Sequence, residues 1–238
     1  MTNHLCLEDS YRRTATGCVV GHSGPHQIWL DQVLFYASGG GQPHDTGRIE
    51  WDSGSARVVD AAKDIENRIL LHLAKDDPVP SIGTIVDQSI DWERRYRFMR
   101  THTALHLLSV VIPLPVTGGA ISLEKGRLDF NMPDAIEDRQ GLEDRLNELV
   151  RNNSPVTTDW ITALELDRNP EMVKTMTVRP PRGSGRIRLI CIGESPALLD
   201  RQPCGGTHVH STGEIGAIRL GKVEKKGRMN RRVNILLE

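Results

Sequence analysis

The stretch at residues 102–106 reads His-Thr-Ala-Leu-His and lies inside a longer segment with helical character. From Trp92 to Ile112 apolar residues recur at helical spacing, and Pro113 follows. Because proline cannot continue a helix, the pattern predicts one that ends there. Residues four apart lie on one face of a helix, so His102 and His106 can offer their imidazoles to a single ion. Alone, however, such a pair is more often a packed or solvated element than a metal site.

A second stretch, Cys204-Gly205-Gly206-Thr207-His208, adds a thiol and a third imidazole. The glycines and the threonine predict a tight bend that brings Cys204 and His208 together and keeps backbone N–H groups close to them. The four side chains are ligands that zinc prefers, and we expect one Zn²⁺ per chain. Four protein ligands close a tetrahedral site, whereas catalytic zinc usually keeps one position open. Either one of the four ligands binds weakly and dissociates from the metal, or the metal organises the pocket without activating a water molecule.

Composition places the chain among ordinary soluble proteins. It has 238 residues, of which 38% are hydrophobic and 26% are charged, enough for two modest domains. No membrane span and no signal peptide are apparent, so we expect a cytoplasmic protein. The four cysteines show no disulfide framework spacing. In a reducing compartment Cys204 is therefore better explained as a metal ligand.

The sequence predicts an α+β protein with two domains, residues 1–90 and 91–238. Residues 16–86 carry short apolar or alternating segments separated by glycine and proline, a pattern typical of a small β-barrel or sandwich. The second domain is expected to contain the histidine-bearing helix, an amphipathic helix over 134–150 and a mixed sheet. The strands of that sheet are predicted at 126–131, 156–166, 186–192, 214–223 and 231–237.

Three consecutive glycines, Gly39, Gly40 and Gly41, precede Gln42 in a candidate binding loop. The stretch lacks the Gly-Lys-Ser/Thr ending of a phosphate loop and the glycine spacing of a dinucleotide fold. It is either a hairpin loop or a cleft wall in which Gln42 and Thr46 form hydrogen bonds with a ligand.

The formal net charge of −1 argues against binding nucleic acid by bulk charge alone. Basic residues are nevertheless grouped in two runs, which are either solvated surface or contacts for phosphate groups. The candidates for phosphate contacts are Arg179, Arg182, Arg186, Arg188, Lys225 and Lys226.

These motifs together resemble the freestanding alanyl-tRNA editing proteins, the AlaX family, in its medium-length form. That family is related to the editing domain of alanyl-tRNA synthetase. The resemblance rests on the histidine pair, the Gly-Gly-Gly-Gln-Pro loop with Asp45 and Gly47, and the stretch 204–209 followed by Thr-Gly-Glu-Ile-Gly at 212–216. Residues 90–95 and 117–119 also match the family pattern. The resemblance therefore covers nearly the whole chain from about residue 16.

The resemblance implies hydrolysis, in trans, of tRNA that carries serine, or sometimes glycine, in place of alanine. His102, His106, Cys204 and His208 match the zinc ligands, and Gln42 matches the glutamine of the editing pocket. An aminoacylation pocket that accepts the methyl side chain of alanine rejects the added hydroxyl of serine only weakly. A separate site must therefore hydrolyse the mischarged tRNA.

For the reaction itself we expect a water to attack the aminoacyl carbonyl while backbone N–H groups near Gly205 and Gly206 stabilise the oxyanion. Either Thr46 or Thr207 could bind the serine hydroxyl, a group that alanine lacks.

Two other functions fit the same residues. One is a zinc-dependent hydrolase of another small ester, and the other is a non-catalytic tRNA-binding module with structural zinc. The expected partner is the acceptor stem and 3′ end of mischarged tRNA, with no membrane partner, and the chain is expected to be a monomer or a weak dimer. His44, beside Asp45, departs from the family pattern and leaves the preferred amino acid open.

Overall fold

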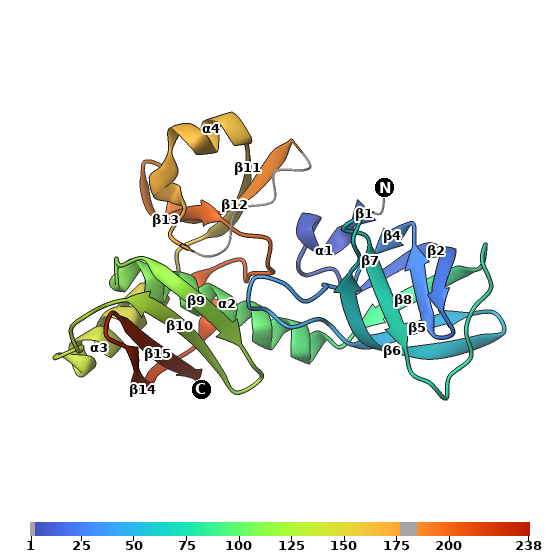
Figure 1. Ribbon diagram of the computed structural model, residues 1–238, viewed down its shortest axis with the longest axis horizontal. Helices are drawn as coiled ribbons and strands as arrows, with labels where there is room; N and C mark the ends of the chain where they lie inside the picture. Colours follow the sequence, from blue (N-terminus) through green and yellow to red (C-terminus); the bar gives the residue numbers. More distant parts are fainter. Residues whose placement is uncertain (1–2, 177–184) are drawn as a thin grey trace. The chain divides into compact units, whose positions relative to one another are not determined.

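Six strands in the first part of the chain close into a barrel, which confirms the expected β-rich N-terminal half. The protein was analysed as a computed structural model that describes residues 3–176 and 185–238. Side chains alternate between the barrel core and the solvent, and the core includes Ile28, Leu30, Ile49 and Leu71. In barrel order the strands are β2 (Thr14–Gly24), β3 (Gln27–Leu30), β7 (Ile69–Leu73), β6 (Gly54–Lys63), β5 (Gly47–Trp51) and β8 (Ile85–Ile90) (Figure 1).

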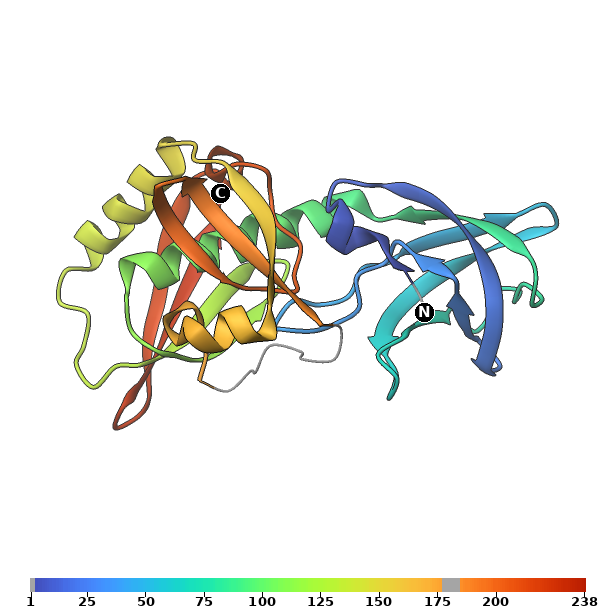
Figure 2. The same cartoon turned by 90° about the horizontal axis from the view of Figure 1, so that it is seen from above.

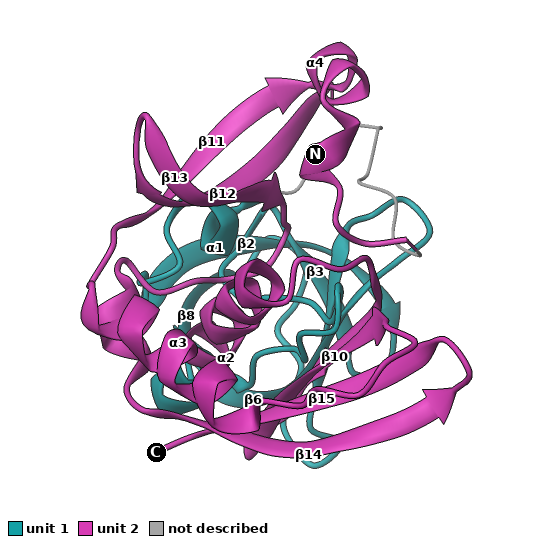
Figure 3. Cartoon of the chain, turned by 90° about the vertical axis from the view of Figure 1, so that its left-hand side faces the viewer, with its two compact units in different colours: residues 1–97 teal, residues 98–238 magenta. Residues whose placement is uncertain are grey.

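A short N-terminal segment accompanies the barrel. It comprises β1 (Asn3–His4), which pairs in parallel with β4 (Gln32–Val33), and the single-turn helix α1 (Leu5–Glu8). Barrel and segment belong to the first of two compact units, residues 1–97, and the second unit comprises residues 98–238 (Figure 3). The sequence places the domain boundary at residue 90, whereas the units divide within a helix, after Arg97. The division into domains 1–90 and 91–238 stays a prediction.

The long helix α2 (Trp92–Val111) follows the barrel and ends where Pro113 predicts. The Asp91 side chain accepts a hydrogen bond from the Arg94 N–H at 3.1 Å and so caps its first turn. Residues 101–109 of α2 are buried on all sides. A helix buried all round must be covered on more than one face, and in the second unit α2 lies between two sheets (Figure 3).

Both sheets of the second unit are antiparallel, which corrects the expected single mixed sheet. In one of them the strands are β14 (Ile218–Gly227), β15 (Asn230–Leu237), β10 (Lys125–Asn131) and β9 (Val116–Ile121). In the other they are β11 (Val156–Thr162), β12 (Arg186–Glu194) and β13 (Ala197–Pro203). Most neighbouring strands are joined by hairpins, which only antiparallel pairs permit. The close approach of β10 to α2 uses Gly126, since a side chain there would collide with Thr101 and Leu105.

The remaining helices of the second unit begin at capping residues. Asp138 accepts the Gly141 N–H at 2.8 Å, so α3 (Arg139–Arg151) begins later than the expected residue 134 and packs along β14 (Figure 2). The predicted strand 156–166 was too long, because a capping box between Thr162 and Glu165 starts α4 (Ala163–Arg168). The short helices η1 (Pro170–Met172) and η2 (Thr212–Ile215) complete the described elements. Within residues 3–176 and 185–238, no helix combines the length and apolar character that crossing a bilayer requires.

Candidate metal centre

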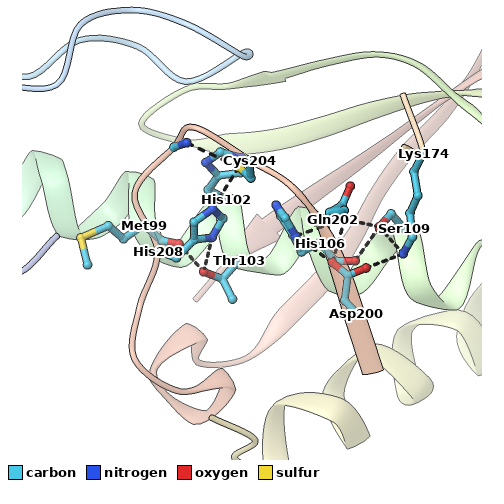
Figure 4. Close-up of polar contacts among 11 residues, drawn as sticks. Met99, His102, Thr103, His106, Ser109, Lys174, Asp200, Gln202, Cys204 and His208 are labelled. Carbon is cyan, nitrogen blue, oxygen red and sulfur yellow. Dashed lines mark hydrogen bonds and ion pairs between the residues drawn. The ribbon is translucent and has the colours of Figure 1, made fainter. Parts of the chain in front are cut away.

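Three imidazoles and one thiol meet in the second unit, between α2 and the loop that follows β13. His102 and His106 come from α2, and Cys204 and His208 come from the loop (Figure 4). One ligand atom from each residue lies within 4.8 Å of the other three, and the three histidines are buried. The geometry therefore places the four side chains where they could hold one metal ion.

Cys204 lies beside two of the imidazoles. Its Sγ atom is 3.5 Å from His102 Nε2 and 3.3 Å from His208 Nε2. Burial raises the pKa of the Cys204 thiol, but the neighbouring imidazoles outweigh it and hold that pKa well below its usual value. The lowered pKa favours the thiolate, which is the form that binds metals.

The hydroxyl of Thr103 fixes the tautomer of His208. Thr103 Oγ1 donates its single proton to the Met99 carbonyl at 2.9 Å. Its 3.1 Å contact with His208 Nδ1 must then be a hydrogen bond donated by the imidazole. Burial lowers the pKa of His208 well below its usual value, so the ring is neutral and its only proton is on Nδ1. The lone pair of Nε2 consequently faces Cys204.

A buried carboxylate orients His106 in the same way. Asp200, whose side chain is fully buried, accepts a hydrogen bond from His106 Nδ1 at 2.8 Å and leaves Nε2 directed at the cluster. Its other oxygen accepts from Lys174 Nζ at 2.6 Å, and the Gln202 amide donates to the carboxylate at 2.7 Å (Figure 4). Burial lowers the pKa of His106, but Asp200 and Cys204 outweigh it and raise that pKa to about 9. A metal ion at Nε2 would displace the proton held there.

Sequence reasoning missed this supporting network. Asp200 and Gln202 are two residues apart and share one face of β13, and Cys204 follows at the same spacing just after the strand ends. That spacing was the available signal, although it identifies a site only when the strand and the face it presents are known. Lys174 and Ser109, which complete the network, carry no local signal at all.

Replacing Asp200 by asparagine is expected to weaken metal binding by about 10–100-fold, the usual effect of losing a carboxylate that orients a ligand histidine. Competition with a chromogenic chelator measures this affinity. Asp159→Asn is the matched control, because Asp159 lies on the opposite face of the same sheet, where it pairs with Arg201 at 2.9 Å. Equal affinities of the Asp200→Asn variant and the unmodified protein would show that the carboxylate does not support His106.

Arg188 holds the loop that carries Cys204 through hydrogen bonds to the loop's backbone carbonyls. One guanidinium nitrogen of Arg188 donates to the Cys204 carbonyl at 3.0 Å and to the Gly206 carbonyl at 2.7 Å. Another donates to Thr158 Oγ1 at 3.3 Å, and Arg188 is only 8% exposed. This position is that of a support for the loop, not of a residue on the surface. Arg188 is therefore not placed to contact phosphate groups, which corrects the prediction from the sequence.

Within the loop, the two glycines have different surroundings. The Gly206 N–H is directed at Cys204 Sγ at 3.4 Å. A Cβ atom built on Gly205 would meet nothing within 4 Å, so the loop is open at this point. Thr207 is fully buried.

The residues predicted for the glycine-rich loop lie in the first unit. Gly39 and Gln42 form an isolated bridge, the Tyr36 hydroxyl donates to the Gly39 carbonyl at 2.9 Å, and Gly40 and Gly41 adopt positive φ angles of 57° and 85°. Such angles favour glycine. Gln42 is buried, and the Thr46 carbonyl accepts the Asp91 N–H at 2.7 Å. The loop is thus a tight turn, and its part in ligand binding stays a proposal.

The predicted phosphate contacts have different positions. Arg186, Lys225 and Lys226 are exposed, and Lys226 pairs with Glu224 at 2.7 Å. Arg179 and Arg182 lie outside the described residues.

Comparison with known proteins relates both units to tRNA synthetases. The family model of the threonyl and alanyl tRNA synthetase second additional domain matches residues 187–234, and that of class II (A) tRNA synthetases matches residues 14–94. The alanyl-tRNA editing protein AlaX-M of Saccharolobus solfataricus is 35% identical over 240 residues, which cover 98% of each chain. The chain belongs to the AlaX-M family. The AlaX-M protein of Pyrococcus horikoshii is 32% identical over 100% of this chain and 99% of its own.

AlaX-M proteins are not the only relatives. The alanine–tRNA ligase of Pyrobaculum arsenaticum is 35% identical over 234 residues, which are 94% of this chain and 25% of the ligase. The chain thus spans about a quarter of the length of the ligases that it matches. The family expected from the motifs is confirmed, and four of those motif residues form the cluster that could hold a metal ion.

Proposed function

We propose that this protein edits mischarged tRNA in trans, by hydrolysing the ester that joins serine, or glycine, to the 3′ end of tRNA(Ala). The observation that carries the proposal is the convergence of His102, His106, Cys204 and His208 beside an open glycine loop. It is supported by the membership of the chain in a family whose curated members are named alanyl-tRNA editing proteins. The reaction is an aminoacyl-tRNA deacylation.

The donor set fits zinc. Zinc binds imidazole and thiolate at ~2.0–2.3 Å, and tetrahedral geometry then separates neighbouring ligand atoms by about 3.3–3.6 Å. The separations of Cys204 Sγ from the two facing imidazole nitrogens, 3.5 and 3.3 Å, fall in this range. Three histidines and one thiolate also suit zinc better than Mg²⁺ or Ca²⁺, which prefer oxygen ligands. When bound, zinc can polarise the ester carbonyl, orient the amino or hydroxyl group of the substrate, or lower the pKa of a water.

The loop residues would stabilise the transition state and support the selection of serine. Since the Gly206 N–H is directed at Cys204 Sγ, we assign the stabilisation of the oxyanion to the Gly205 N–H, where the loop is open. A hydroxyl partner for serine, supplied by Thr207 or Thr46, would favour serine strongly over alanine. A site built to bind a hydroxyl is left with an unsatisfied polar group when that hydroxyl is missing. Gln42 is the proposed pocket residue of the first unit.

Exposed basic residues would bind the tRNA backbone. Arg186, Lys225 and Lys226 are the described candidates, with Arg179 and Arg182 beyond the described residues. Contacts of this kind set the register of the acceptor stem and carry little sequence information. They predict affinity that falls as salt rises.

A deacylation assay tests the proposal. Ser-tRNA(Ala), Gly-tRNA(Ala) and Ala-tRNA(Ala) are each incubated with the protein, with and without a chelator. We expect serine to be released fastest, alanine to be spared, and the chelator to suppress release. Hydrolysis of small model esters but of no charged tRNA would favour a different zinc hydrolase. Binding of charged tRNA with an intact ester would favour a module with structural zinc.

A further inference from the structure

One large aromatic side chain on the metal-bearing unit is exposed without a role in the site described above. Trp160, on β11, is 43% exposed, and the other three tryptophans of the chain are less exposed. Tryptophan has a large aromatic body that is buried on average, so the exposed ring of Trp160 offers a flat face on which another ring could stack.

The sheet register places Trp160 next to the loop that carries Cys204. Trp160 pairs with Arg188 on β12, and the Arg188 carbonyl accepts the Cys204 N–H at 3.1 Å, so the three residues form one row across the sheet. Residues opposite each other in a sheet share a face. The Arg188 side chain confirms which face this is, because it reaches both Thr158 and the Cys204 carbonyl.

The spacing of this row fits a nucleoside. Neighbouring strands are ~4.8 Å apart, so the Cα atoms of Trp160 and Cys204 are separated by about 10 Å across β12. A base stacked on Trp160 would leave its ribose and an attached ester to extend along the row toward Cys204. β11 is an edge strand of this sheet, and among the described residues no named strand pairs with it on the side away from β12.

Charge next to Trp160 favours the same ligand. Arg186 pairs with Thr162 and therefore lies on the same face as Arg188, diagonally adjacent to Trp160, and it is exposed. The nearest carboxylate of β11, Asp159, belongs to the opposite face and pairs with Arg201. An aromatic ring beside a cation is the combination that single-stranded nucleic acid binds, through base stacking and phosphate contact.

We propose that Trp160 is the stacking platform for the terminal base of the charged tRNA, with Arg186 against the preceding phosphate. The proposal rests on the proposed function, because the ester is taken to lie at the Cys204 loop. Trp160 then binds the unpaired 3′ end and presents the aminoacyl group, while the loop residues act on the ester. It is a positioning residue for the substrate and takes no part in the chemical step.

Kinetics of Ser-tRNA(Ala) deacylation by Trp160→Ala and Trp160→Phe test the platform. Loss of one stacked base is expected to raise KM by about 5- to 150-fold in Trp160→Ala, with kcat nearly unchanged, and phenylalanine is expected to restore most of the loss. Leu164→Ala is the matched control, since Leu164 is 60% exposed on α4 of the same unit. It is expected to leave both constants unchanged. A Trp160→Ala variant with the KM of the unmodified protein would overturn the proposal.

A binding measurement separates this inference from the proposed function. The uncharged trinucleotide CpCpA is titrated while tryptophan fluorescence is followed, and quenching that disappears in Trp160→Phe supports the platform even if no charged tRNA is deacylated. If the unmodified protein deacylates Ser-tRNA(Ala) but the trinucleotide causes the same quenching in both proteins, the platform is refuted and the proposed function stands. Dimerisation that Trp160→Ala abolishes, with no response to the trinucleotide, would overturn the proposal in favour of an interface between two copies.

Discussion

Replacing Cys204 by alanine is expected to lower the metal content of the purified protein and to slow deacylation of Ser-tRNA(Ala) by at least about 100-fold, because losing a ligand exceeds the effect of losing an orienting partner. Cys204 is the thiolate of the cluster, and its Sγ lies within 3.5 Å of two imidazole nitrogens. The variant keeps three imidazoles but loses the anionic ligand, so its affinity for a divalent cation is expected to fall. Elemental analysis of purified protein measures the metal, and single-turnover deacylation measures the chemical step.

Cys191→Ala provides the control for this substitution. Cys191 is also in the second unit, but it packs with Ile187 and Leu189 in an apolar cluster on the other face of β12. The control should keep its metal and its activity. Full activity of a Cys204→Ala variant that contains no metal would show that the cluster is not needed for hydrolysis. Unchanged metal content would show that the three histidines suffice to bind the ion.

The metal cluster could be predicted because both of its halves are local patterns. His102 and His106 are one helical turn apart, and the glycines between Cys204 and His208 permit a bend, so each pair is brought together by a few neighbouring residues. The barrel was predictable for a similar reason, since alternation along each strand shows which side chains enter the core. That the two pairs meet was a hypothesis, which the structure supports by placing the ligand atoms within 4.8 Å of one another.

The supporting residues could not be predicted, because their roles depend on tertiary contacts. Arg188 and Arg186 have the same charge and are two residues apart, yet one is buried beneath the Cys204 loop and the other is exposed. The difference arises because the Cys204 loop, which follows β13, and Thr158 on β11 both bind the Arg188 side chain. The start of the helix α4 was also not predicted, although its signal is local. Its capping box, Thr162 with Glu165, is visible in the sequence, but the predicted strand 156–166 ran over it.

Replacing Asp45 by asparagine is expected to lower the free energy of unfolding by about 3–5 kcal/mol, the usual effect of leaving one member of a buried ion pair without its partner. Asp45 and Arg95 are both fully buried in the first unit, and Arg95 Nε lies 2.9 and 2.8 Å from the two carboxylate oxygens. Arg95 also donates to the carbonyls of Ser10 and Leu34, so it would keep its charge in place with nothing to balance it. Chemical denaturation followed by circular dichroism gives the change.

The same substitution also tests what holds the glycine-rich loop. Asp45 accepts the Tyr36 N–H at 2.7 Å, and Tyr36 binds the Gly39 carbonyl, so the ion pair is connected to the loop through one residue. Asp77→Asn is the control, because Asp77 pairs with an Arg57 side chain that is 52% exposed, and solvent screens that pair. It should lower stability far less. An Asp45→Asn/Arg95→Met double variant should regain part of the lost stability, since it removes the unbalanced cation. Equal losses in the Asp45→Asn and Asp77→Asn variants would contradict the assignment of Asp45 and Arg95 as the buried ion pair that anchors this loop.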